Sequence, residues 1–69
     1  MRLSARNSLP GTVRRIERGA VNAEVTIELA PSLNVISIVT LDAVRELNLK
    51  EGDRAYAVIK ASSVMIAVE

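Results

Sequence analysis

The sequence predicts a small, mainly β domain with one short helix, and three observations support this prediction. Apolar and polar side chains alternate strictly over residues 23–29, which is typical of a half-buried strand. Residues 35–40, 55–60 and 62–68 are rich in β-branched residues, which are common in strands. One stretch, residues 41–48, instead repeats its apolar residues every three positions. At 69 residues the chain has room for one domain, which we expect to span residues 1–69.

The N-terminal part contains two weaker strand candidates, residues 2–9 and residues 12–18. Between them lies the dipeptide Pro10-Gly11, which interrupts a strand or bends it sharply. One long kinked strand is therefore an alternative to two short ones.

Residues 23–29 form the clearest strand, with one apolar face made by Ala23, Val25, Ile27 and Leu29. Residues 35–40 read Val-Ile-Ser-Ile-Val-Thr and are apolar at both parities, which predicts a strand covered on both faces. Such coverage requires a neighbour. The loop between these two strands is marked by Pro31-Ser32.

The three-residue period predicts a short helix over residues 41–48. Its end signals are an N-cap, an acid in the first turn and a left-handed C-cap, at Thr40, Asp42 and Asn48. A turn at residues 51–53 then leads into two adjacent strands, residues 55–60 and 62–68.

The resulting order of three strands, one helix and two strands fits a small closed five-stranded β-barrel of the OB type, whose helix after the third strand plugs one end. The competing arrangement is an open sheet with a helix on one face, whose edges must be paired in an oligomer.

Composition excludes several classes of function. The chain has no cysteine and no histidine, which removes thiol nucleophiles, zinc fingers and an imidazole base. Its glycines are isolated and its carboxylates fall at ordinary surface positions, so we expect no enzyme. A net charge of +1 and one aromatic residue, Tyr56, argue against nucleic-acid binding.

The chain also lacks an apolar run of the roughly 18 residues that a membrane span needs, so the expected location is the cytoplasm, without membrane association. Because a chain this short and free of disulfides buries little surface alone, we expect it to associate with further copies of itself.

Hydrogen-bond donors gather near the expected strand ends, and include Ser4, Arg6, Asn7, Thr40, Lys60, Ser62 and Ser63. A fully deprotonated tetrahedral dianion requires donors alone, because it has no proton to give to an acceptor. Taken singly, each residue also has an ordinary role, such as capping a helix, beginning a strand or extending a cation into water.

Four segments together resemble the Mop domain family, the molbindins. They are Ser4-Ala5-Arg6-Asn7, residues 19–25 (Gly-Ala-Val-Asn-Ala-Glu-Val), residues 49–52 (Leu-Lys-Glu-Gly) and residues 57–65 (Ala-Val-Ile-Lys-Ala-Ser-Ser-Val-Met). The resemblance runs almost end to end. It implies an OB-like barrel that binds molybdate, and usually tungstate, as the intact oxyanion for intracellular storage. It also implies a homohexamer, a trimer of dimers, with anions held between subunits.

By this resemblance, a first class of molybdate site uses Ser4, Arg6, Thr40, Lys60, Ala61 and Ser62 from more than one subunit, with Ala61 acting through its backbone N–H. A second anion site uses the turn Gly19, Ala20, Val21 and Asn22, for which a plain hairpin is the alternative. Ala43 stands where the family often has a small hydroxylic residue, and Asn48 where glycine is usual.

The resemblance implies no cofactor and no free metal cation; the metal is bound only within the oxyanion. Two other hypotheses are open: a small β-barrel interaction module for protein or nucleic acid, and a molybdate-dependent sensor without a storage role.

Overall fold

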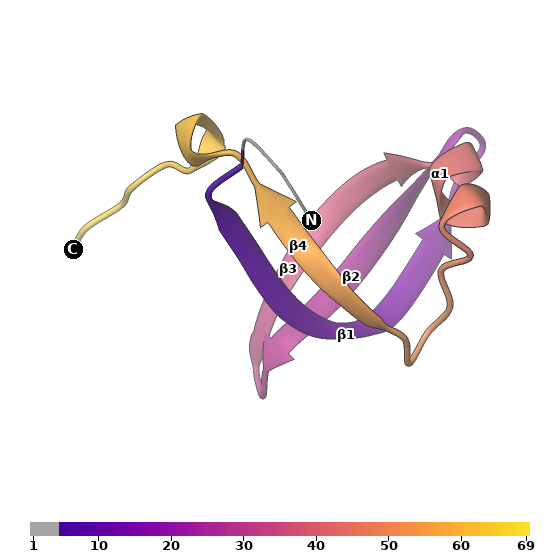
Figure 1. The fold of residues 1–69 in the computed structure, drawn as a ribbon, viewed down its shortest axis with the longest axis horizontal. Coiled ribbons are helices and arrows are strands. Elements are labelled where there is room, and N and C mark those ends of the chain that lie inside the picture. Colours follow the sequence, from indigo (N-terminus) through magenta and orange to yellow (C-terminus); the bar gives the residue numbers. More distant parts are fainter. Residues whose placement is uncertain (1–4) are drawn as a thin grey trace.

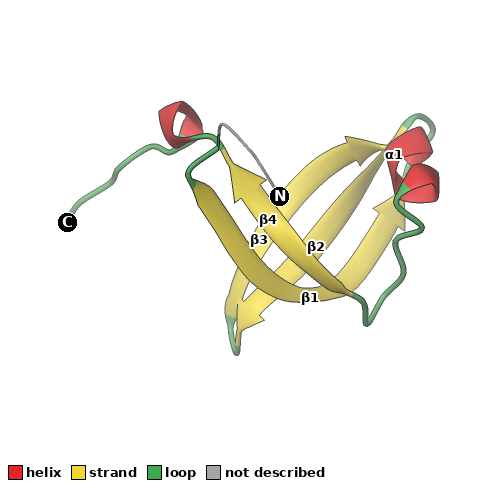
Figure 2. Cartoon of the chain, in the orientation of Figure 1, coloured by secondary structure: helices red, strands yellow, loops and turns green. Residues whose placement is uncertain are grey.

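The computed structural model describes residues 5–69 and has four strands and two short helical segments (Figures 1 and 2). The elements in chain order are β1 (Asn7–Arg18), β2 (Asn22–Ala30), β3 (Leu33–Thr40), α1 (Leu41–Glu46), β4 (Arg54–Ile59) and the 3₁₀ turn η1 (Ala61–Ser63). The fold is mainly β, with one α-helix after the third strand, as the sequence predicts.

The strands form one antiparallel sheet in the order β3-β2-β1-β4, curled into a half-barrel (Figure 1). The long strand β1 joins the two halves: residues 7–12 pair with β4, and residues 12–18 pair with β2. The alternative of one long kinked strand is therefore confirmed. Pro10 lies in the part of β1 that pairs with β4 alone, where its missing N–H leaves no gap in the β1–β2 ladder.

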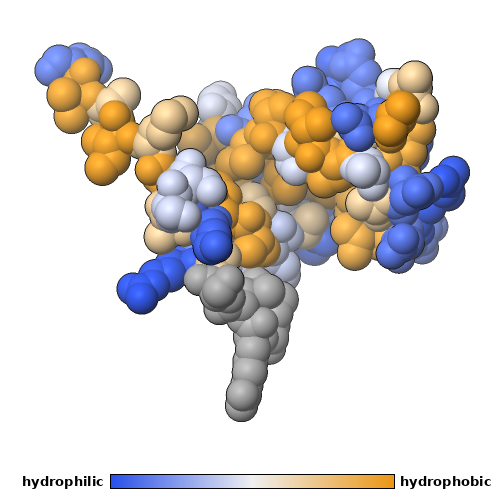
Figure 3. All heavy atoms as spheres, turned by 90° about the horizontal axis from the view of Figure 1, so that it is seen from above, coloured by the Kyte–Doolittle hydropathy of each residue, from blue (hydrophilic) through white to orange (hydrophobic). Residues whose placement is uncertain are grey.

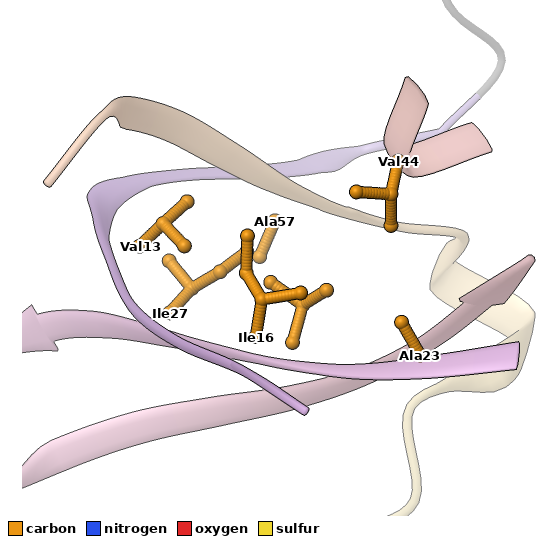
Figure 4. Packing of buried hydrophobic residues seen from close by; sticks show 7 residues of the cluster. Val13, Ile16, Ala23, Ile27, Val44 and Ala57 are labelled. Carbon is orange, nitrogen blue, oxygen red and sulfur yellow. The ribbon is translucent and has the colours of Figure 1, made fainter. Parts of the chain in front are cut away.

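Seven buried side chains make the core: Val13, Ile16, Ala23, Val25, Ile27, Val44 and Ala57 (Figure 4). Three of them lie on the apolar face that the alternation in β2 predicts. Val44 is the one core residue from α1, and it covers the end of the half-barrel (Figure 4).

The predicted N-terminal end of the helix and the left-handed conformation of Asn48 are confirmed, but the helix ends at Glu46, two residues earlier than predicted, and Leu47 is its C-cap. Thr40 is the N-cap, and its Oγ1 accepts a hydrogen bond from Ala43 N at 3.0 Å. At the other end Asn48 is left-handed, with φ 53°, and Asn48 N and Leu49 N donate to Arg45 O and Val44 O. This pair of bonds is a Schellman motif, which satisfies carbonyls that the helix itself leaves free.

The predicted fifth strand is wrong for the single chain. Residues 61–63 form η1, and residues 64–69 are irregular and exposed. The closed five-stranded barrel is therefore corrected to a four-stranded half-barrel. The physical reason is that strand propensity alone provides no pairing partner, and residues 64–68 have none among residues 5–69.

The prediction that the third strand is covered on both faces is also not met within one copy, where only one face of β3 is covered. Its inner residues are half-buried, whereas Ile36 and Ile38 on its outer face are exposed. Among the residues that the structure describes, no helix is long and apolar enough to cross a membrane.

Candidate functional site

The predicted donors fall at two ends of the sheet. At the first, which we call the hairpin end, residues 19–21 connect β1 to β2. Gly19 N donates to Asn22 O at 2.8 Å and closes the turn. The N–H groups of Ala20 and Val21 donate to no backbone acceptor in the described chain. The turn therefore has two adjacent amide N–H groups that are without a backbone acceptor among residues 5–69.

Thr40 lies at the same end, opposite Asn22 in the β2–β3 ladder. Leu41 N donates to Val21 O at 2.9 Å, which ties the start of α1 to the turn. Because the Thr40 hydroxyl oxygen accepts the capping bond, its proton is free to donate elsewhere. The hydrogen-bond donors gathered at the hairpin end are thus the backbone N–H groups of Ala20 and Val21 and the hydroxyl of Thr40.

A hollow of about 380 Å³ lies between the turn and α1, and it is lined by Ala20, Val21, Thr40, Leu41, Asp42 and Arg45. The sequence interpretation did not include Arg45 in a site. The signal that could have found it is its position five residues after Thr40, on the helix that Thr40 caps. Its guanidinium forms an ion pair with Asp42, so much of its charge is already compensated.

The second group of donors lies at the opposite end of β1, which we call the tail end. Arg6 and Lys60 flank the first residue pair of the β1–β4 ladder, Asn7 with Ile59. The Asn7 side-chain amide donates to Ile59 O at 3.2 Å and holds the two segments together. Lys60 O accepts from Ser63 N at 2.8 Å, which bends Ala61 and Ser62 into η1.

The structure therefore divides the first predicted site. Arg6, Lys60, Ala61 and Ser62 lie together at the tail end and are exposed, whereas Thr40 lies at the hairpin end. Ser4 lies outside the described residues. The second predicted site, residues 19–22, is one continuous turn that meets Thr40. Within one copy, the residues predicted for the first molybdate site therefore do not come together in a single site.

The polar groups gathered at both ends of the sheet are hydrogen-bond donors. Amides, hydroxyls, one lysine and one arginine can bind an anion, and the structure holds no group of three or more Asp, Glu, His or Cys in residues 5–69 that could bind a metal cation. These features define a small β domain equipped to bind a ligand that accepts hydrogen bonds.

The chain belongs to the TOBE domain family, whose model matches residues 3–66. It is similar to the probable molybdenum-pterin-binding protein of Haemophilus influenzae, with 54% identity over 69 residues and 100% of both chains covered.

Solved structures of the same fold include a molybdate-binding protein from Sporomusa ovata, with a TM-score of 0.92, 31% identity, and 99% of this chain and 100% of that one covered. They also include the cytoplasmic molybdate-binding protein ModG with molybdate bound, with a TM-score of 0.89 and 60% identity. That match covers 94% of this chain and 46% of ModG, so this chain spans about half of ModG. The resemblance to the molbindins is thereby confirmed.

Proposed function

We propose that this protein binds molybdate, and also tungstate, as the intact oxyanion and serves as an intracellular molybdenum store without catalysis. The observation that carries the proposal is 60% identity, over 94% of the chain, to a protein whose structure contains molybdate. The Haemophilus influenzae relative, which the chain matches over its full length, bears the name of a molybdenum-pterin-binding protein, and this name also links the family to molybdenum. The expected location, the cytoplasm, is that of ModG.

The donor sets explain how an oxyanion is held. Molybdate at neutral pH is a tetrahedral dianion that accepts hydrogen bonds and donates none, so a lining of amides, hydroxyls and cations matches it. At the tail end, Lys60 and Arg6 provide charge and the Ala61 N–H and Ser62 hydroxyl provide directed donors. At the hairpin end, the free amides of Ala20 and Val21, with the Asn22 amide, form the second site.

We place the first site between copies. Thr40 and the tail-end donors lie at opposite ends of one chain, so a site that uses both draws them from two subunits. This division supports association between copies, and we propose that the oligomer is the homohexamer, a trimer of dimers, that the resemblance implies. Enclosure between subunits also removes water from the anion, which strengthens each charge-assisted bond.

Isothermal titration with molybdate, tungstate, sulfate and phosphate, together with native mass spectrometry, tests the proposal. We expect saturable binding of molybdate and tungstate by an oligomer and rejection of hydrogen phosphate, whose proton finds no acceptor. A well-folded oligomer that takes up none of the four anions would overturn it.

A further inference from the structure

The hollow at the hairpin end has one cation and one anion in its wall. It has a volume of about 380 Å³ and lies between the β1–β2 turn and α1, which are neighbours in Figure 1. Ala20, Val21 and Thr40 line it with the donors of the second anion site, and Asp42 and Arg45 line it from α1. In Figure 3 this end of the molecule shows hydrophilic side chains next to hydrophobic ones. Neither charged residue is among those that the sequence predicts for a site.

The start of α1 is bonded to its surroundings. Leu41 N donates to Val21 O at 2.9 Å, and Ala43 N donates to the Thr40 hydroxyl oxygen at 3.0 Å. The anion site at the hairpin end therefore depends on the turn, on the proton of the Thr40 hydroxyl and on the charged side chains in the wall of the hollow. Because the amides and the hydroxyl are neutral, the charge of the wall is decided by the two charged residues.

Arg45 keeps donors that its ion pair does not use. Its Nη2 group donates to Oδ1 of Asp42, three residues earlier on the helix. The pair uses this one nitrogen and leaves the Nε and Nη1 donors of the guanidinium outside it. Donors arranged as in a guanidinium match the oxygens of an oxyanion. Arg45 can therefore bind an anion in the hollow while Asp42 remains beside it.

Asp42 opposes the binding of a dianion in the same hollow. A carboxylate only accepts hydrogen bonds, so it repels a fully deprotonated oxyanion. Its second effect is to orient Arg45. This effect is small, because the side chains of Arg45 and Asp42 are 74% and 75% exposed and such exposed pairs are weak. Since the repulsion grows with the charge of the ligand, it outweighs the orienting effect for a dianion.

We propose that Arg45 is the cation of the anion site at the hairpin end and that Asp42 lowers the affinity of this site for dianions. The inference rests on the proposed function, because it assigns two further residues to the second oxyanion site. The donors of the turn determine where the anion lies, and the charged pair on α1 determines how tightly it is bound. Because Asp42 compensates the cation in the empty site and repels the ligand in the filled site, the anion is released readily.

Titration of the full chain with tungstate, followed by NMR, tests this assignment. The backbone N–H signals of Ala20 and Val21 and the Nε–H signal of Arg45 report the hairpin end separately from the tail end. We expect all three signals to move in the parent protein. Arg45→Gln should weaken binding measured at the two amides by about 10-fold or more, and Asp42→Asn should strengthen it by about 3- to 10-fold.

Matched controls remove the same charges elsewhere. Arg15→Gln removes an exposed arginine whose ion pair with Glu17 lies outside the hollow, and Glu46→Gln removes an exposed carboxylate of α1 that does not line it. Each control should change the affinity by less than about 2-fold, because solvent and salt screen charges outside the site. Controls that match the effects of Arg45→Gln and Asp42→Asn would reduce the inference to an effect of net charge and overturn it.

Perrhenate gives a readout that a change of shape would not produce, because it is a tetrahedral monoanion whereas tungstate is a dianion. Coulomb repulsion scales with the charge of the ligand, so Asp42→Asn should raise the affinity for perrhenate less than that for tungstate. Equal gains for the two anions would refute the role of Asp42.

The NMR titration also separates this inference from the proposed function. If tungstate moves the signals of Ala61 and Ser62 but none of the three hairpin-end signals, the inference is wrong and oxyanion binding at the tail end stands. If no signal moves at either end, the proposed function fails together with the inference.

Discussion

Val13 and Ile16 are three residues apart in one strand, yet both point into the core. Alternation would place them on opposite faces. The register with β2 explains the exception: Val13 pairs with Ile27 and Arg15 with Thr26, so Arg14 is an extra residue in a β-bulge. The bulge restores the inward direction of Ile16 and lets Arg14 reach Glu28, with Nε to Oε1 at 2.8 Å.

Deleting Arg14 is therefore predicted to leave the chain folded, because it removes the extra residue and keeps Arg15 opposite Thr26. Val13 and Ile16 are then two residues apart, which is the spacing of one face of a regular strand. Arg14→Ala is the matched control; it keeps the extra residue and loses only an exposed ion pair, at a cost of about 0.2–1 kcal/mol. Urea unfolding followed by circular dichroism checks both. A deletion variant that fails to fold would contradict this prediction and show that the chain needs the bend at the bulge.

Gly11→Ala is predicted to lower the free energy of unfolding by about 1–3 kcal/mol. A Cβ at this position would lie 2.6 Å from Glu28 O and 2.7 Å from Ile27 Cγ2, so the backbone of β2 would have to shift. Gly19→Ala is the milder comparison, with its nearest atom at 3.2 Å. Equal stability loss in the two variants, measured by thermal unfolding, would contradict the crowding argument.

Asn48→Gly is predicted to raise stability by up to about 1 kcal/mol. Asn48 is left-handed at the C-terminal end of α1, a conformation that costs glycine nothing and costs other residues about 1–2 kcal/mol. Asn48→Val, which is β-branched, should be less stable than the parent. Chemical denaturation should give the highest free energy of unfolding for Asn48→Gly, an intermediate value for the parent and the lowest for Asn48→Val. Any other order would argue against a Schellman motif at the end of α1.

Thr40→Asp separates the structural role of this residue from its proposed role in binding. Aspartate caps a helix as well as threonine, so α1 and the stability should be preserved. A carboxylate, however, accepts hydrogen bonds only and repels a dianion, so molybdate binding that uses Thr40 should be lost. Titration calorimetry measures the affinity, and Thr40→Ser, which keeps the hydroxyl, should bind like the parent. Unimpaired binding by Thr40→Asp would remove Thr40 from the site.

Lys60→Ala is predicted to weaken molybdate binding by about 10- to 100-fold, because it removes a charge-assisted bond from the dianion. Arg6→Ala should have a smaller effect in the same direction. Lys50→Ala is the control, since this exposed lysine lies in the turn before β4 and away from both donor groups. If Lys50→Ala and Lys60→Ala reduce the affinity equally, net charge rather than a site at the tail end governs binding.

Local features of the chain were predictable from sequence because short-range physics governs them. The alternation in β2 identifies its buried face, and the polar residues Thr40 and Asn48 mark the ends of α1, since each satisfies backbone groups of its own neighbourhood. The donor types likewise indicated an anion rather than a cation.

Features that join distant segments were decided by the tertiary structure. The extra residue at Arg14 exists only in relation to the register of β2, and Thr40 meets Val21 only because β2 and β3 pair antiparallel. The same pairing places Lys60 at the other end of the sheet. Residues 64–68 have the composition of a strand, but a strand forms only where another offers free N–H and C=O groups. Within residues 5–69 of one copy, this segment stays unpaired.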